Sequence, residues 1–316
     1  MAAAARISIV SAAASLPPTS ELAVRSDRVE GDNAESALFP VRCRRNVLRD
    51  HEHIEQFVID AAHSALGQAG LTTQDPDRLY GYVSVSEYYA PNGLYAVHRD
   101  LGLSDSCLVV PINSEFTNNI VGLLHAWEGV LTGHSHCALI ASGTSWTRHV
   151  QPQHPHAVIV SDAAAAVVVK RSDHGLAIVD VETETVSGEY GAMTMGVRGG
   201  GGRPTFLMNE AGVEAFKSTG HDGPVRLVRR LLARNDVLPS EVTLLSHQPS
   251  SAILDYWNDQ IQPKRHIHTF AENSNMEQSA ALVNLAQYWN EIDTRYVVMV
   301  GLGIGAHNAG ILLERH

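Results

Sequence analysis

Apolar and polar positions along the chain follow two alternating periods, one typical of strands and one typical of helices. Apolar, β-branched runs predict strands at 6–10, 82–85, 106–112, 137–141, 163–169, 176–181, 242–246, 296–300 and 310–313. Helical spacing predicts helices at 55–69, 94–101, 120–131, 213–217, 225–233, 250–257 and 277–289. Strands that alternate with amphipathic helices indicate an α/β fold.

The two halves of the chain repeat the same order of elements. CALIASG at 137–143 corresponds to YVVMVGLG at 296–303, and AAAAVVVK at 163–170 corresponds to AGILLERH at 309–316. We therefore predict two similar α/β halves, at residues 1–173 and 174–316, with a ligand site between them.

The segment 188–204, which contains RGGGGRP, is expected to be a surface loop that connects elements of the second half. It lacks the Gly-Lys-Ser/Thr ending of a phosphate-binding loop. Two glycines and a proline, Gly220, Gly223 and Pro224, are expected to interrupt the helical pattern that follows.

Composition narrows the function classes. The 316 residues are 44% hydrophobic and 18% charged, as in an ordinary globular protein. A net charge of -11 disfavours nucleic acid as a partner. The chain has no run near the roughly 20 apolar residues of a membrane helix and no signal peptide pattern. We therefore expect a cytoplasmic protein with no membrane or nucleic-acid partner.

Cysteines and histidines are the next candidates for chemistry. Three cysteines, Cys43, Cys107 and Cys137, are too few for a disulfide framework and indicate reduced thiols. Histidines cluster at 134–136, beside Cys137, and at 154–156 around Pro155. Such pairs could bind a metal, but zinc sites usually combine two ligand clusters. Because no matching cluster exists, we favour solvated loop histidines and expect no metal.

Five motifs, in order along the chain, resemble one protein family. They are VIVSDAAAAVVVKRS at 158–172, FLMNEAGVEAFK at 206–217, SHQPS at 246–250, AENSNMEQSAA at 271–281 and GLGIGAHNAGILLE at 301–314. Each is similar to a motif of β-ketoacyl-ACP synthase III, in the thiolase superfamily. The resemblance implies a thiolase fold with two duplicated halves in a layered αβαβα architecture.

The resemblance also implies substrates and assembly. Relatives use acyl-CoA or acyl carrier protein thioesters, need no cofactor and form homodimers, so the segment 107–132 is expected near a dimer interface. The region 24–49 is shorter than in the family, which affects the expected interface and tunnel mouth. A basic rim for an acidic carrier protein could comprise Arg198, Arg203, Lys217, Arg226, Arg229 and Arg230, or these residues could be a solvated helix face.

Family members hold a Cys, a His and an Asn together in the active site. His247 and Asn273 match the His and Asn positions in their motifs. The resemblance implies that His247 is a base or hydrogen-bond donor and that the Asn273 amide donates to an oxyanion. The N–H of Gly305 is a candidate second donor.

In this sequence no cysteine stands at the position expected for the family cysteine. Counting back without gaps from Gly133 puts it at Phe116, next to Ser114, Glu115 and Thr117. Ser114, ahead of Thr117, could carry an acyl group with His247 as its base. The same residues could simply cap a helix, and Glu115 could favour the helix N-terminus or, if buried, act as an acid or base with a raised pKa.

Three interpretations follow: acyl transfer through a hydroxyl, direct joining of two substrates with His247 as base, or a non-catalytic subunit. Retention of His247 and Asn273 favours an enzyme. We predict an atypical ketosynthase III-like acyltransferase or condensing enzyme of natural-product biosynthesis, on polyketide or fatty-acid-derived substrates. The alternatives are a non-catalytic partner in a ketosynthase heterodimer and a thioester hydrolase.

Overall fold

The computed structural model describes residues 6–23, 43–88, 90–150, 155–196, 205–208 and 210–316. Its largest feature is a ten-stranded sheet in the order β12-β11-β13-β14-β8-β1-β7-β6-β4-β5. The first-half elements are β1 (Arg6–Ser15), α2 (Ile54–Gln68), β4 (Arg78–Ser84), α3 (Leu94–Leu101), β5 (Leu108–Pro111), α4 (Asn118–Leu131), β6 (Cys137–Thr144) and β7 (Ala163–Ser172).

The second half continues with the corresponding elements. They are β8 (Leu176–Thr185), α5 (Glu210–Ala215), α6 (Asp222–Arg234), β11 (Val242–Ser246), α7 (Ser251–Ile261), β12 (Arg265–Ile267), α8 (Phe270–Asn273), α9 (Ala280–Tyr288), β13 (Tyr296–Gly303) and β14 (His307–Arg315). Two small sheets pair β2 (Ser20–Leu22) with β3 (Arg44–Asn46) and β9 (Met193–Gly196) with β10 (Thr205–Met208).

The two halves have the same strand order and the same strand directions. In the first half β4 runs parallel to β5 and β6, while β7 is antiparallel to β6 and to β1. In the second half β11 runs parallel to β12 and β13, while β14 is antiparallel to β13 and to β8. The halves join where β1 pairs briefly with β8. This repeat confirms the predicted duplicated fold; the boundary at residues 173 and 174 stays a prediction.

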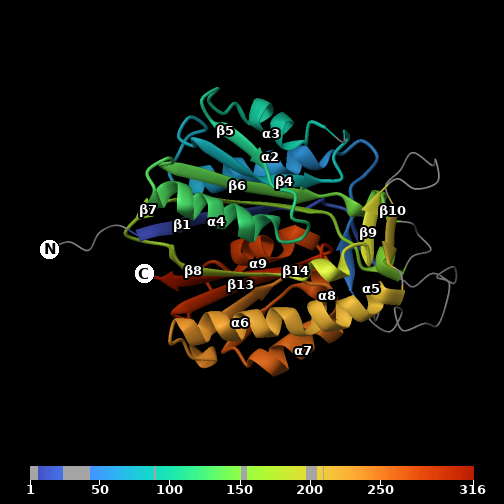
Figure 1. Cartoon of the computed structure of the whole chain (residues 1–316). Helices are drawn as coiled ribbons and strands as arrows, with labels where there is room; N and C mark the ends of the chain where they lie inside the picture. Colours follow the sequence, from blue (N-terminus) through green and yellow to red (C-terminus); the bar gives the residue numbers. More distant parts are fainter. Residues whose placement is uncertain (1–5, 24–42, 89, 151–154, 197–204, 209) are drawn as a thin grey trace.

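Helices and sheets stack in five layers (Figure 1). α2 and α3 cover the outer side of the first-half strands. α4 and α9 lie between the strands of the two halves, and α6 and α7 cover the outer side of the second-half strands. Strands covered on both faces must be apolar throughout. All eight residues of β6 are buried, which explains the apolar run CALIA at its start.

Two predictions about local structure are wrong. The segment 188–204 is not simply a loop, because β9 and β10 form an antiparallel pair on either side of residues 197–204, which lie outside the described residues. The expected break near Gly220 is also absent: a π-helical turn, Phe216–His221, connects α5 directly to α6. Pro224 lies in the first turn of α6, where a missing N–H is tolerated.

None of the helices in the described part of the chain is long and apolar enough to cross a bilayer.

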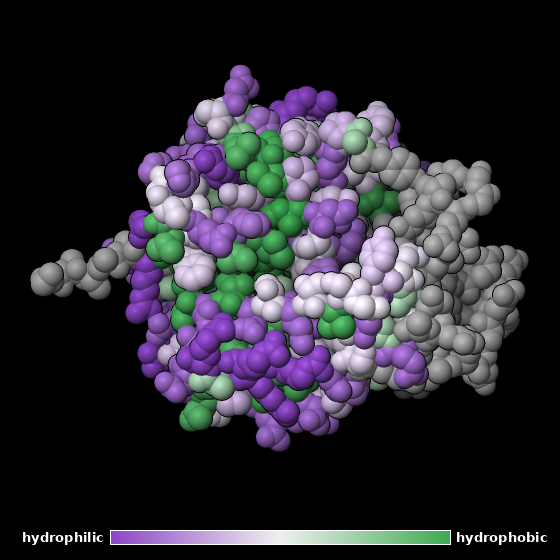
Figure 2. Space-filling view, viewed as in Figure 1, coloured by the Kyte–Doolittle hydropathy of each residue, from purple (hydrophilic) through white to green (hydrophobic). Residues whose placement is uncertain are grey.

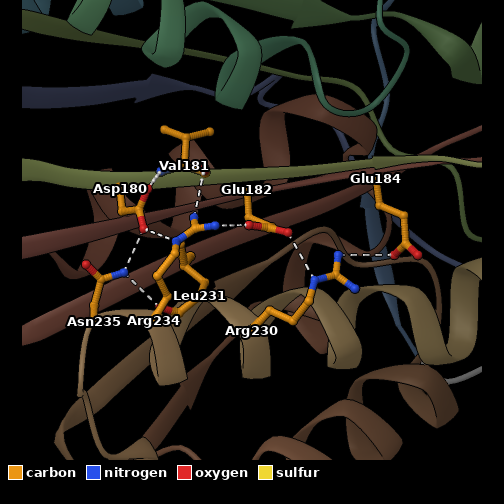
Figure 3. Close-up of polar contacts among 8 residues, drawn as sticks. All are labelled: Asp180, Val181, Glu182, Glu184, Arg230, Leu231, Arg234 and Asn235. Carbon is orange, nitrogen blue, oxygen red and sulfur yellow. Dashed lines mark hydrogen bonds and ion pairs between the residues drawn. The ribbon is translucent and has the colours of Figure 1, made fainter.

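A ladder of ion pairs connects α6 to β8 (Figure 3). The guanidinium of Arg226 lies 3.4 Å from Glu184, that of Arg230 lies 3.0 Å from Glu182, and that of Arg234 lies 2.7 Å from Asp180. The three arginines follow each other at four-residue spacing, so they share one face of the helix. The three carboxylates alternate along β8 and share one face of that strand.

This ladder changes the interpretation of the expected basic rim. Arg226 and Arg230 are neutralised by carboxylates of β8, and Arg229 donates to the Gln260 carbonyl. Arg198 and Arg203 lie outside the described residues, as does the side chain of Lys217. Arg226 and Arg230 therefore hold α6 against the sheet, and docking of a carrier protein on this face stays a prediction.

We predict that Arg234→Met lowers the free energy of unfolding by about 1 kcal/mol, because it removes two partly exposed ion pairs and keeps the aliphatic stem. Urea denaturation at low salt and in 1 M NaCl measures the difference, which should shrink at high salt. Arg229→Met is the control, because its guanidinium bonds to Gln260 and not to the ladder. Equal, salt-independent losses in both variants would contradict the prediction.

Candidate active site

Three loops converge between the two halves of the fold. The first is the turn 114–117, which precedes α4; the second is the loop 247–250 between β11 and α7; the third is the segment 274–279 between α8 and α9. His247 comes directly after β11, and its N–H donates to the Val300 carbonyl of the neighbouring strand β13 (2.9 Å). Ligand sites in α/β proteins commonly lie at such strand ends.

The imidazole of His247 is buried, with the residue 3% exposed, and its two nitrogens differ. Nε2 lies 3.1 Å from Oδ1 of Asn275. An amide oxygen only accepts, so Nε2 carries the proton of the neutral ring. Nδ1 is buried and has no hydrogen-bond partner among the described residues. The ring therefore presents an unused lone pair, as a general base requires.

Asn275 and Glu277 connect His247 to a second buried imidazole, that of His156. The Asn275 amide nitrogen lies 3.2 Å from Nε2 of His156 and donates to Oε1 of Glu277 (3.3 Å). The Glu277 carboxyl lies 3.4 Å from Nε2 of His156 and 3.7 Å from Nε2 of His247. One amide and one carboxyl thus bridge the same two rings.

Burial sets the protonation of the two acidic groups at the site. Desolvation raises the pKa of Glu277, whose side chain is fully buried, and the contact with His247 opposes the rise. Burial, and to a lesser extent the charge of Glu277, raises the pKa of Glu115 to about 7. Each carboxyl has one buried oxygen, Oε2, without a hydrogen-bond partner in the described structure. Both groups can therefore hold a proton at a pH where ordinary carboxyls are ionised.

The turn before α4 directs an aromatic ring toward His247. Glu115 and Phe116 have positive φ angles of 20° and 59°, a conformation that bulky residues rarely adopt. The Phe116 ring centroid lies 5.3 Å from that of His247 and 5.7 Å from that of Trp146. The residue at the predicted position of the family cysteine thus packs directly against the imidazole.

The two candidate hydroxyls are engaged elsewhere. Thr117 Oγ1 donates to the Ser114 carbonyl (2.8 Å) and lies 2.7 Å from Nε2 of His307. Nε2 of His307 also contacts the Ser114 carbonyl, which only accepts, so this nitrogen carries a proton and cannot take one from Thr117. Ser114 Oγ donates to Oδ1 of Asn118 (3.1 Å).

These contacts correct one prediction. The expected pairing of Ser114 or Thr117 with His247 is not formed; both residues bond to His307 or Asn118 instead. Burial lowers the pKa of His307, which keeps its ring neutral. Its N–H therefore serves to hold the turn 114–117.

Asn273 is placed differently from the expectation. Its Oδ1 accepts from the Asn46 side chain (3.1 Å), while the amide that contacts His247 belongs to Asn275. Gly305 lies beside the His307 ring, in the turn between β13 and β14. The oxyanion roles of Asn273 and Gly305 stay predictions.

The three thiols are poorly suited to nucleophilic attack. Burial raises the pKa of Cys107 to about 11 and that of Cys137 to about 12, and both pack in the cluster around α2. Cys43 lies 3.2 Å from the hydroxyl of Ser274, and burial raises its pKa as well. In the part of the chain that the structure describes, no group of three or more His, Cys, Asp or Glu side chains could hold a metal ion.

Sequence reasoning missed four members of the site: His156, Asn275, Glu277 and His307. His156 was expected to be a solvated loop residue, which is wrong, because it is 6% exposed and bonded to the site. Glu277 carried a signal that was overlooked: it is the one carboxylate after Asn273 in the motif 271–281. His134 and His136 are exposed as expected, and His154 lies outside the described residues.

Comparison with known proteins supports the fold and the resemblance. No family model matches the chain. A β-ketoacyl-[acyl-carrier-protein] synthase III of Nitratidesulfovibrio vulgaris is 25% identical over 232 residues, 69% of each chain. The 3-oxoacyl-(acyl carrier protein) synthase III of Pseudomonas aeruginosa superposes with a TM-score of 0.83 at 20% identity, over 98% of both chains. The priming β-ketosynthase of the R1128 polyketide pathway also gives 0.83, at 18% identity, over 100% of this chain and 98% of its own. The thiolase fold and homology to synthase III are thus confirmed.

We predict that stability falls as pH rises from about 4.5 to about 7. In this range the unfolded Glu115 has lost its proton and the folded Glu115 retains it, so folding binds protons and weakens with increasing pH. In Glu115→Gln, the free energy of unfolding should fall by on the order of 3 kcal/mol less than in wild type over this pH range. Urea denaturation at several pH values measures this difference. Glu128→Gln, on the exposed side of α4, should keep the wild-type slope. An unchanged slope in Glu115→Gln would refute the assignment.

Proposed function

We propose that this protein is a ketosynthase III-like enzyme that transfers an acyl group from a CoA or carrier-protein thioester directly to an acceptor, without an acyl-enzyme. The observation that carries the proposal is the contact between Phe116 and His247. An aromatic side chain stands where the relatives' motif predicts a nucleophilic thiol, and a base with a free lone pair remains beside it. A phenyl ring has no nucleophilic atom, so the acceptor itself must attack.

The hydroxyl mechanism is disfavoured by the contacts of its candidates. Thr117 lies against a protonated nitrogen of His307, and Ser114 donates to Asn118. A serine or threonine nucleophile needs a base that can accept its proton. His247 has an unpartnered Nδ1 that could serve as this base, but the ring bonds to Asn275 and to neither hydroxyl.

In the proposed reaction, Nδ1 of His247 takes a proton from the acceptor as the acceptor attacks the thioester carbonyl. The carbon–sulfur bond then breaks, and the proton passes to the departing thiolate. Asn275 holds the opposite nitrogen and fixes the tautomer. The Glu277 carboxyl, 3.7 Å away, would stabilise the imidazolium that forms. Donors for the oxyanion are proposed from Asn273 and the N–H of Gly305.

Two alternatives are less well supported. A non-catalytic subunit has no need for a buried carboxyl–amide–imidazole network, which costs desolvation free energy and is more typical of a functional site. A thioester hydrolase needs water as the acceptor, and it differs from transfer by releasing free acid without another acceptor. We propose a natural-product pathway because structural relatives include a polyketide priming ketosynthase and the tetronic acid condensing enzyme AbyA1 (TM-score 0.83, 18% identity).

We also propose a homodimer. Partly exposed apolar residues follow one face of α4 (Val121, Leu124, Trp127 and Leu131), and Leu108 is 53% exposed on the edge strand β5. Figure 2 shows apolar surface in the middle of this face of the molecule. Patches of this kind commonly mark interaction sites.

We expect Leu108→Lys to convert dimers to monomers in light scattering, because it puts a charge into the apolar contact. Leu238→Lys, at a leucine that is also more than half exposed but lies in the connection from α6 to β11, should leave the dimer intact. A monomeric wild-type protein, or a dimer that survives Leu108→Lys, would contradict this interface.

The mechanism predicts a specific mass-spectrometric result. Wild-type protein incubated with acyl-CoA of several chain lengths should show no covalent adduct, whereas Phe116→Cys should gain the mass of one acyl group. Thiol release in the presence of amine, alcohol and malonyl-CoA acceptors should fall about 10²–10⁴-fold in His247→Ala. His136→Ala, at an exposed histidine, is the control.

An adduct on wild-type Ser114 or Thr117 would overturn direct transfer. Unchanged turnover in His247→Ala would overturn the role of the base. Release of free acid at the same rate with and without acceptors would favour the hydrolase.

A further inference from the structure

The side-chain amide of Asn275 uses all four of its hydrogen-bonding positions. Its Oδ1 lies 3.1 Å from Nε2 of His247 and accepts from the backbone N–H of Glu277 (3.0 Å). Its Nδ2 lies 3.2 Å from Nε2 of His156 and donates to Oε1 of Glu277 (3.3 Å). An amide has two donor hydrogens and two acceptor lone pairs, so each of them meets one partner here.

The backbone N–H of Glu277 decides which way this amide points. A side-chain amide can be turned over, which exchanges its oxygen and its nitrogen without changing its shape. Here the turned amide is excluded, because a backbone N–H only donates and would then face another donor. The backbone of Asn275 is itself fixed: its N–H donates to the Ile159 carbonyl (2.9 Å), and its carbonyl accepts from Ser161 (2.8 Å). One group that cannot change its role therefore fixes which end of the amide faces each imidazole.

The two imidazoles consequently have opposite roles at the same ring atom. Nε2 of His247 faces an oxygen and must donate, whereas Nε2 of His156 faces an N–H and must accept. A neutral imidazole has one N–H and one lone pair, so His156 carries its proton on Nδ1 while His247 carries it on Nε2. This leaves Nδ1 of His247 as the lone pair that the proposed reaction uses.

From this geometry we infer that His156 is a positioning residue of the proposed acyl transfer. By accepting one hydrogen of the Asn275 amide, it holds the amide oxygen against Nε2 of His247. Asn275 is 1% exposed and His156 is 6% exposed, so bulk solvent does not supply a substitute acceptor. The inference rests on the proposed function for its effect on catalysis, whereas the positions of the protons can be measured without any substrate.

Removal of the His156 ring would act on His247 through the amide. One N–H of Asn275 would stay buried without an acceptor, which is more costly than the loss of an exposed hydrogen bond. The side chain would rotate toward another acceptor and move its oxygen away from His247. The imidazole could then carry its proton on either nitrogen, and only molecules with the proton on Nε2 would present a base at Nδ1.

Nuclear magnetic resonance of the full-length protein, with isotope-labelled histidine, shows which ring nitrogen carries the proton. His247→Gln and His156→Gln assign the two signals by difference. Wild type should show the proton of His247 on Nε2 and that of His156 on Nδ1. In Asn275→Asp both side-chain oxygens accept, so His156 should now carry a proton on Nε2, whereas His247 should keep its own proton there.

Thiol release from acyl-CoA measures the catalytic consequence. His156→Leu should lower kcat about tenfold, while the KM for acyl-CoA stays within about twofold of wild type. His156→Gln should recover most of this loss, because its carbonyl oxygen can accept the same N–H. His136→Ala, at an exposed histidine, is the control and should behave like wild type.

A wild-type His247 with its proton on Nδ1, or a neutral His156 with its proton on Nε2, would overturn the inference. Unchanged kcat in His156→Leu, or equal losses in His156→Leu and His156→Gln, would overturn it as well. If His156→Leu does not fold, the wild-type spectrum and Asn275→Asp decide the question. The expected proton positions in a protein that releases no thiol would refute the proposed function, and the hold of His156 on His247 would stand.

Discussion

The ring of His307 holds the turn before α4, and the composition of the active site follows from that contact. Its Nε2 proton contacts the Ser114 carbonyl, and the Thr117 hydroxyl closes the same turn. The contact stabilises positive φ angles at two non-glycine residues, a conformation that costs on the order of 1–3 kcal/mol each. The strained residue Phe116 consequently faces His247. His307 thus keeps the turn in place and engages the Thr117 hydroxyl, while Asn118 accepts from the Ser114 hydroxyl.

On the other side of the His247 ring, polar and acidic side chains set its hydrogen bonding. Asn275 fixes the proton of His247 on one nitrogen, so the other nitrogen is left as an acceptor. Glu277 and Glu115 are desolvated beside it, and their pKa values rise because the charged form loses its water. The carboxylates of β8, by contrast, are neutralised by arginines of α6. Glu277 instead meets the imidazoles of His156 and His247, an arrangement more typical of a functional site than of a stabilising ion pair.

The fold could be predicted from the sequence because strand and helix periods repeat in both halves. His247 could be predicted because it stands at a strand-to-helix junction within a motif. The neighbouring amide could not: Asn273 and Asn275 stand two residues apart, and the positive φ of Ser274 between them decides which one faces the imidazole. The pairing of Thr117 with His307 spans 190 residues and depends on tertiary packing alone. Such contacts leave no local pattern.

A nucleophile on the enzyme divides acyl transfer into two steps, each with its own chemical demand. A site without a nucleophile must bind both substrates at once, so the acceptor has to be held and deprotonated in place. The structure supplies an imidazole with a free lone pair for the deprotonation, and buried carboxyls that can take a further proton. In the proposed reaction, Phe116 therefore offers no nucleophilic atom beside the imidazole, and Glu277 lies close enough to the ring to stabilise its charged form.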